Sequence, residues 1–343
     1  MQRRGLLSLV AVAVAFVALA VFVLSRADRS AGYAAAGGRA LPGLADKLGE
    51  VAAIRVTRGA MAINLRVGDR GWAVAEKGGY PADQDRVRKL LLQLADLELI
   101  EPKTDKPELL ARLDLDDPAN GKSTEIALQN RNGAMLGQIV IGRDRPSDIA
   151  KGEAGVYVRK SGSDRAWLAR GSFALGGDVL SWLDRRIIDI APTRVASVVL
   201  TAADGSAAIV ARSSADQPFA IDAPPADARP KPDTALAAPA GALDQLELTD
   251  VKRATDGPTP KDNTATVAFT TFDGVTIGLR LSPPEVGDWL TIQATGQATG
   301  SDRGEAEAKA FNDRLSPWTF QIPPDRAKLL RMTLSDFLLP RGS

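Results

Sequence analysis

The stretch Leu94–Glu101, which reads LADLELIE, decides the fold of this chain, because it recurs as LDQLELTD at Leu243–Asp250. The two copies lie 149 residues apart. In each copy, leucines at helical spacing give way to alternating apolar and polar residues. That change of period is typical of a helix that ends and a strand that begins. The recurrence predicts that one α+β unit occurs twice.

The segments that precede this stretch support the same repeat. Alternating or β-branched residues predict three short strands in each copy, at 54–57, 62–67 and 72–74, and again at 197–201, 207–211 and 218–221. A helix is expected next. In the first copy Asp83 is placed to cap it, and its apolar face consists of Val87, Leu90, Leu91, Leu94 and Leu97. In the second copy Asp233 is placed to cap a less regular helix that runs to about Leu246.

A hairpin is expected after the stretch in both copies. Its turns are Asn132-Gly133, between residues 124–130 and 134–141, and Asp273-Gly274, between residues 265–271 and 275–281. Asn-Gly and Asp-Gly favour a two-residue type I′ turn, in which both central residues have positive φ. One more strand follows in each copy. Both copies are then expected to close with a short helical stretch that ends in Trp182 or Trp318.

These landmarks occur in the same order in both halves, so the sequence predicts an α+β fold of two duplicated units, at residues 52–191 and 192–339. Each unit is expected to be a mainly antiparallel sheet with packed helices. The alternative is that two unrelated α+β domains share similar turn chemistry.

An unbroken apolar run, Leu6–Leu24, contains only Ser8 as a polar residue. Its 19 residues are long enough for a helix that crosses a hydrocarbon core of about 30 Å. We therefore expect residues 1–25 to form a cytoplasmic N-terminus and a transmembrane signal-anchor, and residues 26–51 to form a flexible tether and approach. A cleaved secretory signal and a buried soluble helix are the alternatives.

The flanks of this run predict its orientation. Arg3 and Arg4 precede it without any acid, whereas Arg26 and Arg29 after it are offset by Asp28. Because basic residues favour the cytoplasmic side, the main body is expected to be exported.

Composition excludes several classes of function. The chain has 43 basic and 42 acidic residues, a balance that does not favour nucleic acid as a partner. It has neither cysteine nor histidine, so disulfides, Ser-His-Asp triads, Cys-His pairs and zinc knots are impossible. Carboxylate pairs, Ser-Lys dyads and oxygen-ligand metal sites remain chemically available.

The candidate motifs in the sequence do not match the patterns of known sites, and we expect no catalytic, cofactor-binding or metal-binding residues. The glycine pairs and Gly121-Lys122-Ser123 lack the spacing of a phosphate loop. The acidic run Asp114–Asp117 lacks the EF-hand pattern and is more simply a turn before Pro118. Asp83 and Asp85 are expected at a helix start for their charge.

Two further groups are interpreted as structural. Ser181 and Ser316 form no nucleophile-base motif with Arg185 or Arg186. The five tryptophans suit core positions better than a carbohydrate platform; they are Trp72, Trp167, Trp182, Trp289 and Trp318.

Taken together, several motifs resemble the bacterial family of domain of unknown function 4340 (DUF4340). They are the N-terminal anchor, a strand with Trp72, the helix start Tyr80-Pro81-Ala82-Asp83, the turn Leu113-Asp114-Leu115-Asp116-Asp117-Pro118, a hairpin that ends Ile139-Val140-Ile141-Gly142, and Val156-Tyr157-Val158. The resemblance covers most of the first copy and, more weakly, the second. It implies a protein of the bacterial inner membrane with a periplasmic body, often encoded near gliding-motility-type ABC transporter components. It carries over no catalytic residues.

The sequence therefore favours a binding function over catalysis. The leading hypothesis is a non-enzymatic, membrane-tethered periplasmic accessory that binds a protein partner or a polymer in the cell envelope, with an ABC transporter component as one candidate and no cofactor. The alternatives are a carboxylate-based enzyme acting on envelope glycans and a small-ligand sensor with a site between the repeats.

Overall fold

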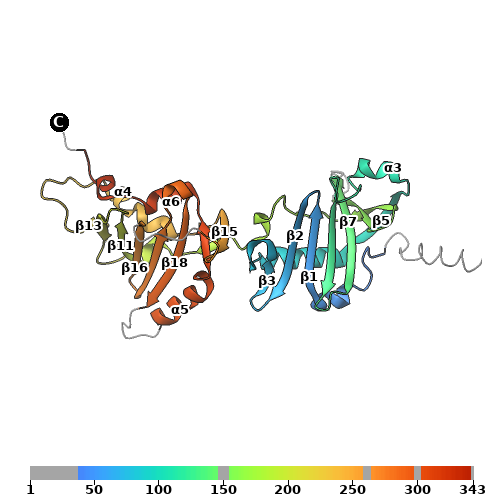
Figure 1. Cartoon of the computed structure of the whole chain (residues 1–343), viewed down its shortest axis with the longest axis horizontal. Helices are drawn as coiled ribbons and strands as arrows, with labels where there is room; N and C mark the ends of the chain where they lie inside the picture. The colour runs from blue at the N-terminus through green and yellow to red at the C-terminus, as the bar shows by residue number, and fades with distance from the viewer. Residues whose placement is uncertain (1–37, 146–153, 258–263, 297–302, 341–343) are drawn as a thin grey trace, which may run out of the picture. The chain divides into compact units, whose positions relative to one another are not determined.

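The structure is a computed structural model, which describes residues 38–145, 154–257, 264–296 and 303–340. Contacts divide the chain into two compact units (Figure 1). The described residues of 38–72 and 84–177 form the first, and those of 73–83 and 178–340 form the second. The described strands make two large antiparallel sheets, of nine and eight strands. The expected α+β class is confirmed at this level.

The elements of the first half of the chain are mostly strands. The strands are β1 Val51–Arg58, β2 Met61–Gly68, β3 Gly71–Val74, β4 Tyr80–Pro81, β5 Glu98–Thr104, β6 Thr124–Asn130, β7 Met135–Arg145, β8 Gly155–Lys160 and β9 Ala166–Arg170. The α-helices are α2 Gln84–Asp96 and α3 Pro107–Leu110, and the 3₁₀ helices are η1 Ala45–Glu50, η2 Ala75–Lys77 and η3 Ala111–Leu113.

The second half has a similar make-up. Its strands are β10 Arg186–Ile188, β11 Val195–Thr201, β12 Ala207–Ala211, β13 Ala220–Ile221, β14 Leu246–Glu247, β15 Asp250–Arg253, β16 Thr266–Thr271, β17 Val275–Leu281, β18 Trp289–Gly296 and β19 Trp318–Gln321. Its α-helices are α4 Asp233–Ala237, α5 Arg303–Leu315 and α6 Pro324–Leu330. Its 3₁₀ helices are η4 Leu180–Trp182, η5 Pro192–Arg194, η6 Ala238–Leu243, η7 Pro284–Val286 and η8 Leu334–Phe337.

The two sheets have the same strand order. The larger runs β4-β3-β2-β1-β6-β7-β8-β9-β5 and the smaller runs β13-β12-β11-β16-β17-β18-β19-β15. Among the strands that the structure describes, the edge strand β4 alone lacks a counterpart in the smaller sheet. Each sheet is therefore mainly a meander. The exception is the strand at one edge, β5 or β15, which precedes in sequence most of the strands that separate it from the first strands of the meander.

Strand registers define which residues are equivalent. Ile54 of β1 pairs with Leu65 and Leu128, and Val198 of β11 pairs with Val210 and Phe269. A β-bulge follows Val51 in β1 and Val195 in β11, at the same distance from these pairs. All six apolar residues of this register are buried and face the core.

Both expected hairpins form, but the expected turn type is wrong. The amide of Gly133 donates to the carbonyl of Asn130, and the amide of Gly274 donates to that of Thr271. Only the glycines have positive φ, 78° and 84°, whereas Asn132 and Asp273 do not. This is a three-residue loop, a type I turn followed by a left-handed glycine. A side-chain oxygen of Asn130 or Thr271 accepts a bond across the loop from the residue after the glycine, which favours the longer turn.

The helix α2 confirms the expected amphipathic pattern. Its buried side chains lie on one face, which packs on the larger sheet (Figure 1); they are Val87, Leu90, Leu91, Leu94 and Ala95. The second copy differs, because Asp233 is the first residue of α4 and Pro232, without a side-chain hydrogen bond, is the cap. Asp233 is therefore not a capping residue. Pro239 and Gly241, which are poor helix formers, then stand in the 3₁₀ helix η6.

Trp318 does not end a helical stretch. It is the first residue of β19, the strand equivalent to β9, so it is not the counterpart of Trp182; by register, Phe320 of β19 corresponds to Trp167 of β9. The helix α5, which precedes β19, has no counterpart between β8 and β9, where only residues 161–165 intervene.

The amide side chain of Asn312 on α5 bonds to the backbone of β18. It donates to the carbonyl of Ala294 at 2.7 Å and accepts from the amide of Ala294 at 2.8 Å. The helix thus satisfies backbone groups in the later part of β18, beyond Trp289 and Leu290, which are the residues that pair with β19.

A second, smaller hydrophobic cluster lies in the first unit around α3 and η3. Its buried members are Leu110, Leu115, Val140 and Ala166. Gly142 permits the turn after η3 to approach β7, because a Cβ at residue 142 would lie 2.2 Å from the carbonyl oxygen of Leu113. Two of the family-like motifs, the Leu113–Pro118 turn and the Ile139–Gly142 hairpin end, therefore touch each other.

The residues that precede β1 are part of the fold from Gly38 onward. The amide of Leu99 donates to the carbonyl of Gly38, and the amide of Ala40 donates to that of Leu97. Leu44 is almost completely buried. This part of the expected tether is therefore bound along β5 rather than flexible. The apolar run Leu6–Leu24 lies outside the described residues, and in the described part no helix has the length and apolarity needed to cross a bilayer.

Residues 73–83 belong to the second unit because of a compact aromatic and ionic cluster. Tyr80 meets Trp318 edge to face, with ring centroids 4.9 Å apart. Arg253 lies over the same Trp318 ring at 4.2 Å, and Lys77 pairs with Asp250 at 2.5 Å. Burial, aided by the charge of Asp184, raises the pKa of Tyr80 above its ordinary value.

Candidate functional site

The acids considered from the sequence occupy structural positions. Asp83 directly precedes α2, and Asp85 lies in its first turn, where a negative charge complements the helix dipole. Among the described residues, no group of three or more acids gathers in a way that could hold a metal ion. These two aspartates are therefore explained by the helix start.

The acidic run Asp114–Asp117 forms a turn, as the sequence predicts. Asp117 accepts bonds from the amide of Ala119 and the side chain of Asn120. The backbone carbonyl of Asp116 accepts from the hydroxyl of Ser123, and its carboxylate accepts from the amide of Lys122. The stretch Gly121-Lys122-Ser123 therefore packs against Asp116. Glycine is needed at residue 121, because a Cβ there would lie 2.1 Å from the Asp116 carboxyl carbon.

Ser181, the two arginines and four of the tryptophans also occupy structural positions. Ser181 donates its hydroxyl to the carbonyl of Asp178 at the start of η4. Arg185 pairs with Glu247 at 3.1 Å, and Arg186 lies 3.7 Å from Asp189. The core assignment is confirmed for the four buried tryptophans, Trp167, Trp182, Trp289 and Trp318. Trp72 is half-buried.

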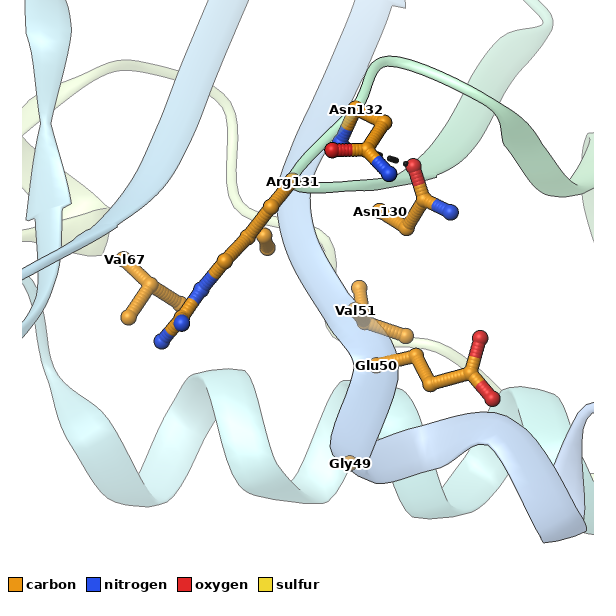
Figure 2. Close-up of a pocket in the computed structure, with 8 residues that line it drawn as sticks. Gly49, Glu50, Val51, Val67, Asn130, Arg131 and Asn132 are labelled. Atoms are coloured by element: carbon orange, nitrogen blue, oxygen red, sulfur yellow. Dashed lines mark hydrogen bonds between the residues drawn. The ribbon is translucent and has the colours of Figure 1, made fainter.

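The structure reveals a hollow in the first unit that the sequence did not indicate (Figure 2). It encloses about 420 Å³ where η1 meets β1, beside the end of β2 and the β6–β7 turn. Its lining residues are Gly49, Glu50, Val51, Ala52, Val67, Asn130, Arg131 and Asn132. The volume falls within the range of small-ligand pockets.

Two opposite charges line this hollow. The side chain of Arg131 extends from the β6–β7 turn toward Val67, whereas the carboxylate of Glu50 points to the other side (Figure 2). The two groups therefore do not pair with each other. Both side chains are exposed, and Val67 is 39% exposed although it continues the core-facing row of Ile63 and Leu65.

The equivalent place in the second unit is filled by side chains. By register, Val67 corresponds to Arg212, Glu50 to Arg194, and Arg131 to Phe272. Arg212 donates from Nε to the carbonyl of Val195 at 3.0 Å, from Nη1 to Ala215 at 2.8 Å and from Nη2 to Pro192 at 2.6 Å. Its guanidinium also lies 4.5 Å from the ring centroid of Phe219 and 5.7 Å from that of Phe272.

An ionic network closes the same region of the second unit. Arg194 contacts Asp273 at 2.5 Å and Glu307 of α5 at 2.9 Å. The hydrogen bond to Glu307, against a smaller effect of burial, raises the pKa of Arg194. Burial acts to raise the pKa of Asp273, but hydrogen bonds from Thr271 and Arg194 outweigh it and lower that pKa. The second unit therefore satisfies these charges internally.

Sequence reasoning missed the hollow because its walls come from three segments that are distant in the chain. One signal was present: aligning the repeats by their first strands places Val67 opposite Arg212 and Glu50 opposite Arg194. Residues of different charge and size at equivalent positions indicate that the two units pack differently there.

The fold defines the class of this protein as an α+β protein with two antiparallel meander sheets of the same strand order. The particular family follows from a family model, described as Domain of unknown function (DUF4340), which matches residues 72–265. The match covers more than half of the chain, so the chain belongs to this family, in agreement with the resemblance seen in its motifs. No curated protein and no solved structure matches the chain.

Proposed function

We propose that this protein is a binding component of the bacterial cell envelope, tethered to the inner membrane by Leu6–Leu24 with its body in the periplasm. The length and apolarity of that run and the basic residues before it support the tether. Thirteen residues, 25–37, separate the run from Gly38. Fully extended, they span about 45 Å, so β5 of the first unit would stay near the membrane surface.

The observation that carries a binding role is the open hollow of the first unit. The second unit fills the same place with Arg212 and closes it with the Arg194 network. The first unit leaves about 420 Å³ empty there and presents the charges of Glu50 and Arg131 at its walls. The same backbone position is thus occupied by the protein's own side chains in the second unit and is empty in the first. The empty position in the first unit is suited to receive a side chain of a partner.

We further propose that the two sheets arose by duplication of one unit. The shared strand order, the equivalent bulges after Val51 and Val195, and the equivalent glycine turns support this origin. Duplication explains why the first unit has a hollow where the second unit is filled. After duplication, one copy can keep its internal packing while the other changes its residues to bind a partner.

The partner that we favour is a protein of the envelope, and the family resemblance makes an ABC transporter component the first one to test. The experiment is mild-detergent purification of the full chain from membranes, with and without residues 1–25. We expect the full chain in the membrane fraction with a stoichiometric partner, and the truncated chain, which lacks the signal-anchor, in the soluble cytoplasmic fraction without it. Recovery of the full chain without any partner under several gentle conditions would contradict the proposal.

A further inference from the structure

The first-unit hollow and the Arg212 site of the second unit are built on the same backbone. In each, a 3₁₀ helix ends directly before the bulged strand, and the first strand residue donates its amide three residues back, from Val51 to Leu48 or from Val195 to Pro192. The hairpin on the opposite side has the same type I turn and left-handed glycine in both. The second unit therefore serves as a template for what this backbone can hold.

In the template, the group held is a guanidinium. The carbonyls of Val195, Pro192 and Ala215 accept its three hydrogen bonds, and the ring of Phe219 covers its face at 4.5 Å. Carbonyl oxygens and an aromatic face are the groups that a cation prefers in a partly desolvated place. The Pro192 carbonyl accepts this bond in addition to the one from Val195.

In the first unit, Val67 takes the position of Arg212 and supplies no donor. Val51, the counterpart of the Val195 that accepts from Nε, lines the hollow. The hollow is thus lined by the counterparts of Arg212 itself and of its Val195 acceptor, whereas Leu48, the counterpart of Pro192, does not line it. A ligand that restores the missing group would bring its own guanidinium.

The hollow has one charge of each sign at its walls. Glu50 replaces Arg194, so an acid stands where the template has a base. Arg131 replaces Phe272 and opposes a second cation. Because Glu50 is exposed, its side chain can turn toward a cation in the hollow, whereas Arg131 can swing out into solvent.

We infer that the hollow of the first unit binds an arginine side chain of the partner polypeptide, which occupies the place that Arg212 fills in the second unit. The inference rests on the proposed function and names the chemistry that its partner presents. Glu50 supplies the counter-charge, the backbone around Val51 supplies acceptors, and Arg131 is the internal competitor.

The first test uses the full chain in detergent micelles and saturation-transfer NMR. The probe is N-acetyl-L-arginine methylamide, and the control is the norleucine analogue, which has no charge. We expect only the arginine probe to bind. Glu50→Gln should weaken binding by about tenfold, the scale of one charge-assisted hydrogen bond. Arg131→Ala should strengthen it.

Two substitutions of Val67 complete this test. Val67→Arg should fill the hollow from within, abolish binding of the probe, and raise the urea midpoint of unfolding above that of Val67→Met, which adds length without charge. Val67→Ala, which leaves the hollow open, is the matched control and should retain binding. Weaker binding with Arg131→Ala and tighter binding with Glu50→Gln would overturn the inference in favour of an anion. Equal binding of both probes, or binding unaffected by Val67→Arg, would overturn it as well.

A second test separates the inference from the proposed function. The purification from membranes is repeated with Val67→Arg and Val67→Ala chains. We expect the partner to be lost with the first and kept with the second. If both variants retain the partner, the inference fails while the proposed function stands. If the arginine probe binds but no partner is recovered with any chain, the proposed function and the assignment of the arginine to a partner both fail, and only the preference of the hollow for a guanidinium is retained.

Discussion

The contact between Gly142 and the turn after η3 allows a quantitative prediction for Gly142→Ala. The new Cβ would lie 2.2 Å from the carbonyl oxygen of Leu113 and 2.9 Å from that of Asp114. Ordinary contact begins near 3.4 Å, so one backbone segment must retreat by about 1.2 Å. Neither obstacle is a flexible side chain. The substitution therefore separates the turn from β7.

The cost follows from what the turn holds. Overpacking of this kind costs about 1–3 kcal/mol. Retreat of the turn also strains the hydrogen bonds from Arg159 to the carbonyls of Leu115 and Asp116, at 2.6 and 3.1 Å, and loss of one such charge-assisted bond costs about 1.5 kcal/mol. It also loosens Leu115, which is fully buried. We expect Gly142→Ala to lower the free energy of unfolding of the first unit by about 3 kcal/mol.

The assay is urea unfolding followed by tryptophan fluorescence, combined with hydrogen exchange to localise the change. Gly177→Ala is the matched control, because a Cβ there meets nothing within 4 Å and its φ is not positive. It should change stability by less than about 0.5 kcal/mol. Exchange should accelerate at residues 110–123 in Gly142→Ala alone. A Gly142→Ala protein as stable as the control, with unchanged exchange in that segment, would refute the reasoning.

Three further outcomes are expected in the second unit. Arg212→Met removes three hydrogen bonds to carbonyls and a ring contact, and should cost about 2–3 kcal/mol in urea unfolding, with Arg212→Lys intermediate; equal stability would contradict the template. The folded state raises the pKa of Tyr80, so the free energy of unfolding should fall as pH rises above about 10, where the unfolded tyrosine ionises. Tyr80→Phe should reduce this fall between pH 9 and 11. Parallel curves of stability against pH for the two proteins would exclude the effect. Asn312→Ala should cost about 1–2 kcal/mol and speed proteolysis within α5, whereas Lys309→Ala on its exposed face should leave the cleavage rate unchanged.

The hairpins show where local sequence signals succeed and where they stop. Asn132-Gly133 and Asp273-Gly274 correctly predict tight turns, because glycine adopts the left-handed conformation without a steric penalty. The type of turn was wrong, because it depends on bonds across the loop. The side chains of Asn130 and Thr271 accept bonds that favour the three-residue loop.

The tryptophans show a similar limit. Burial of Trp182 and Trp318 could be expected from their apolar neighbours, but their places in the fold could not. Trp318 follows the inserted helix α5, so counting along the chain misplaces it by an element. Strand pairing corrects the assignment: β9 and β19 occupy equivalent places in their sheets, and Phe320 is the residue of β19 that corresponds to Trp167.

The sequence by itself determined the α+β class, the main helix and hairpins, and the repeated order of elements, because each depends on periodicity or turn chemistry within a short segment. It also placed the chain in its family through motifs such as the Leu113–Pro118 turn. Only the tertiary structure decided that Gly142 meets this turn, that residues 73–83 join the second unit, and that Val67, Glu50 and Arg131 surround a hollow that Arg212 fills in the other copy. These features depend on strand register and on close packing between distant segments, which no local pattern encodes.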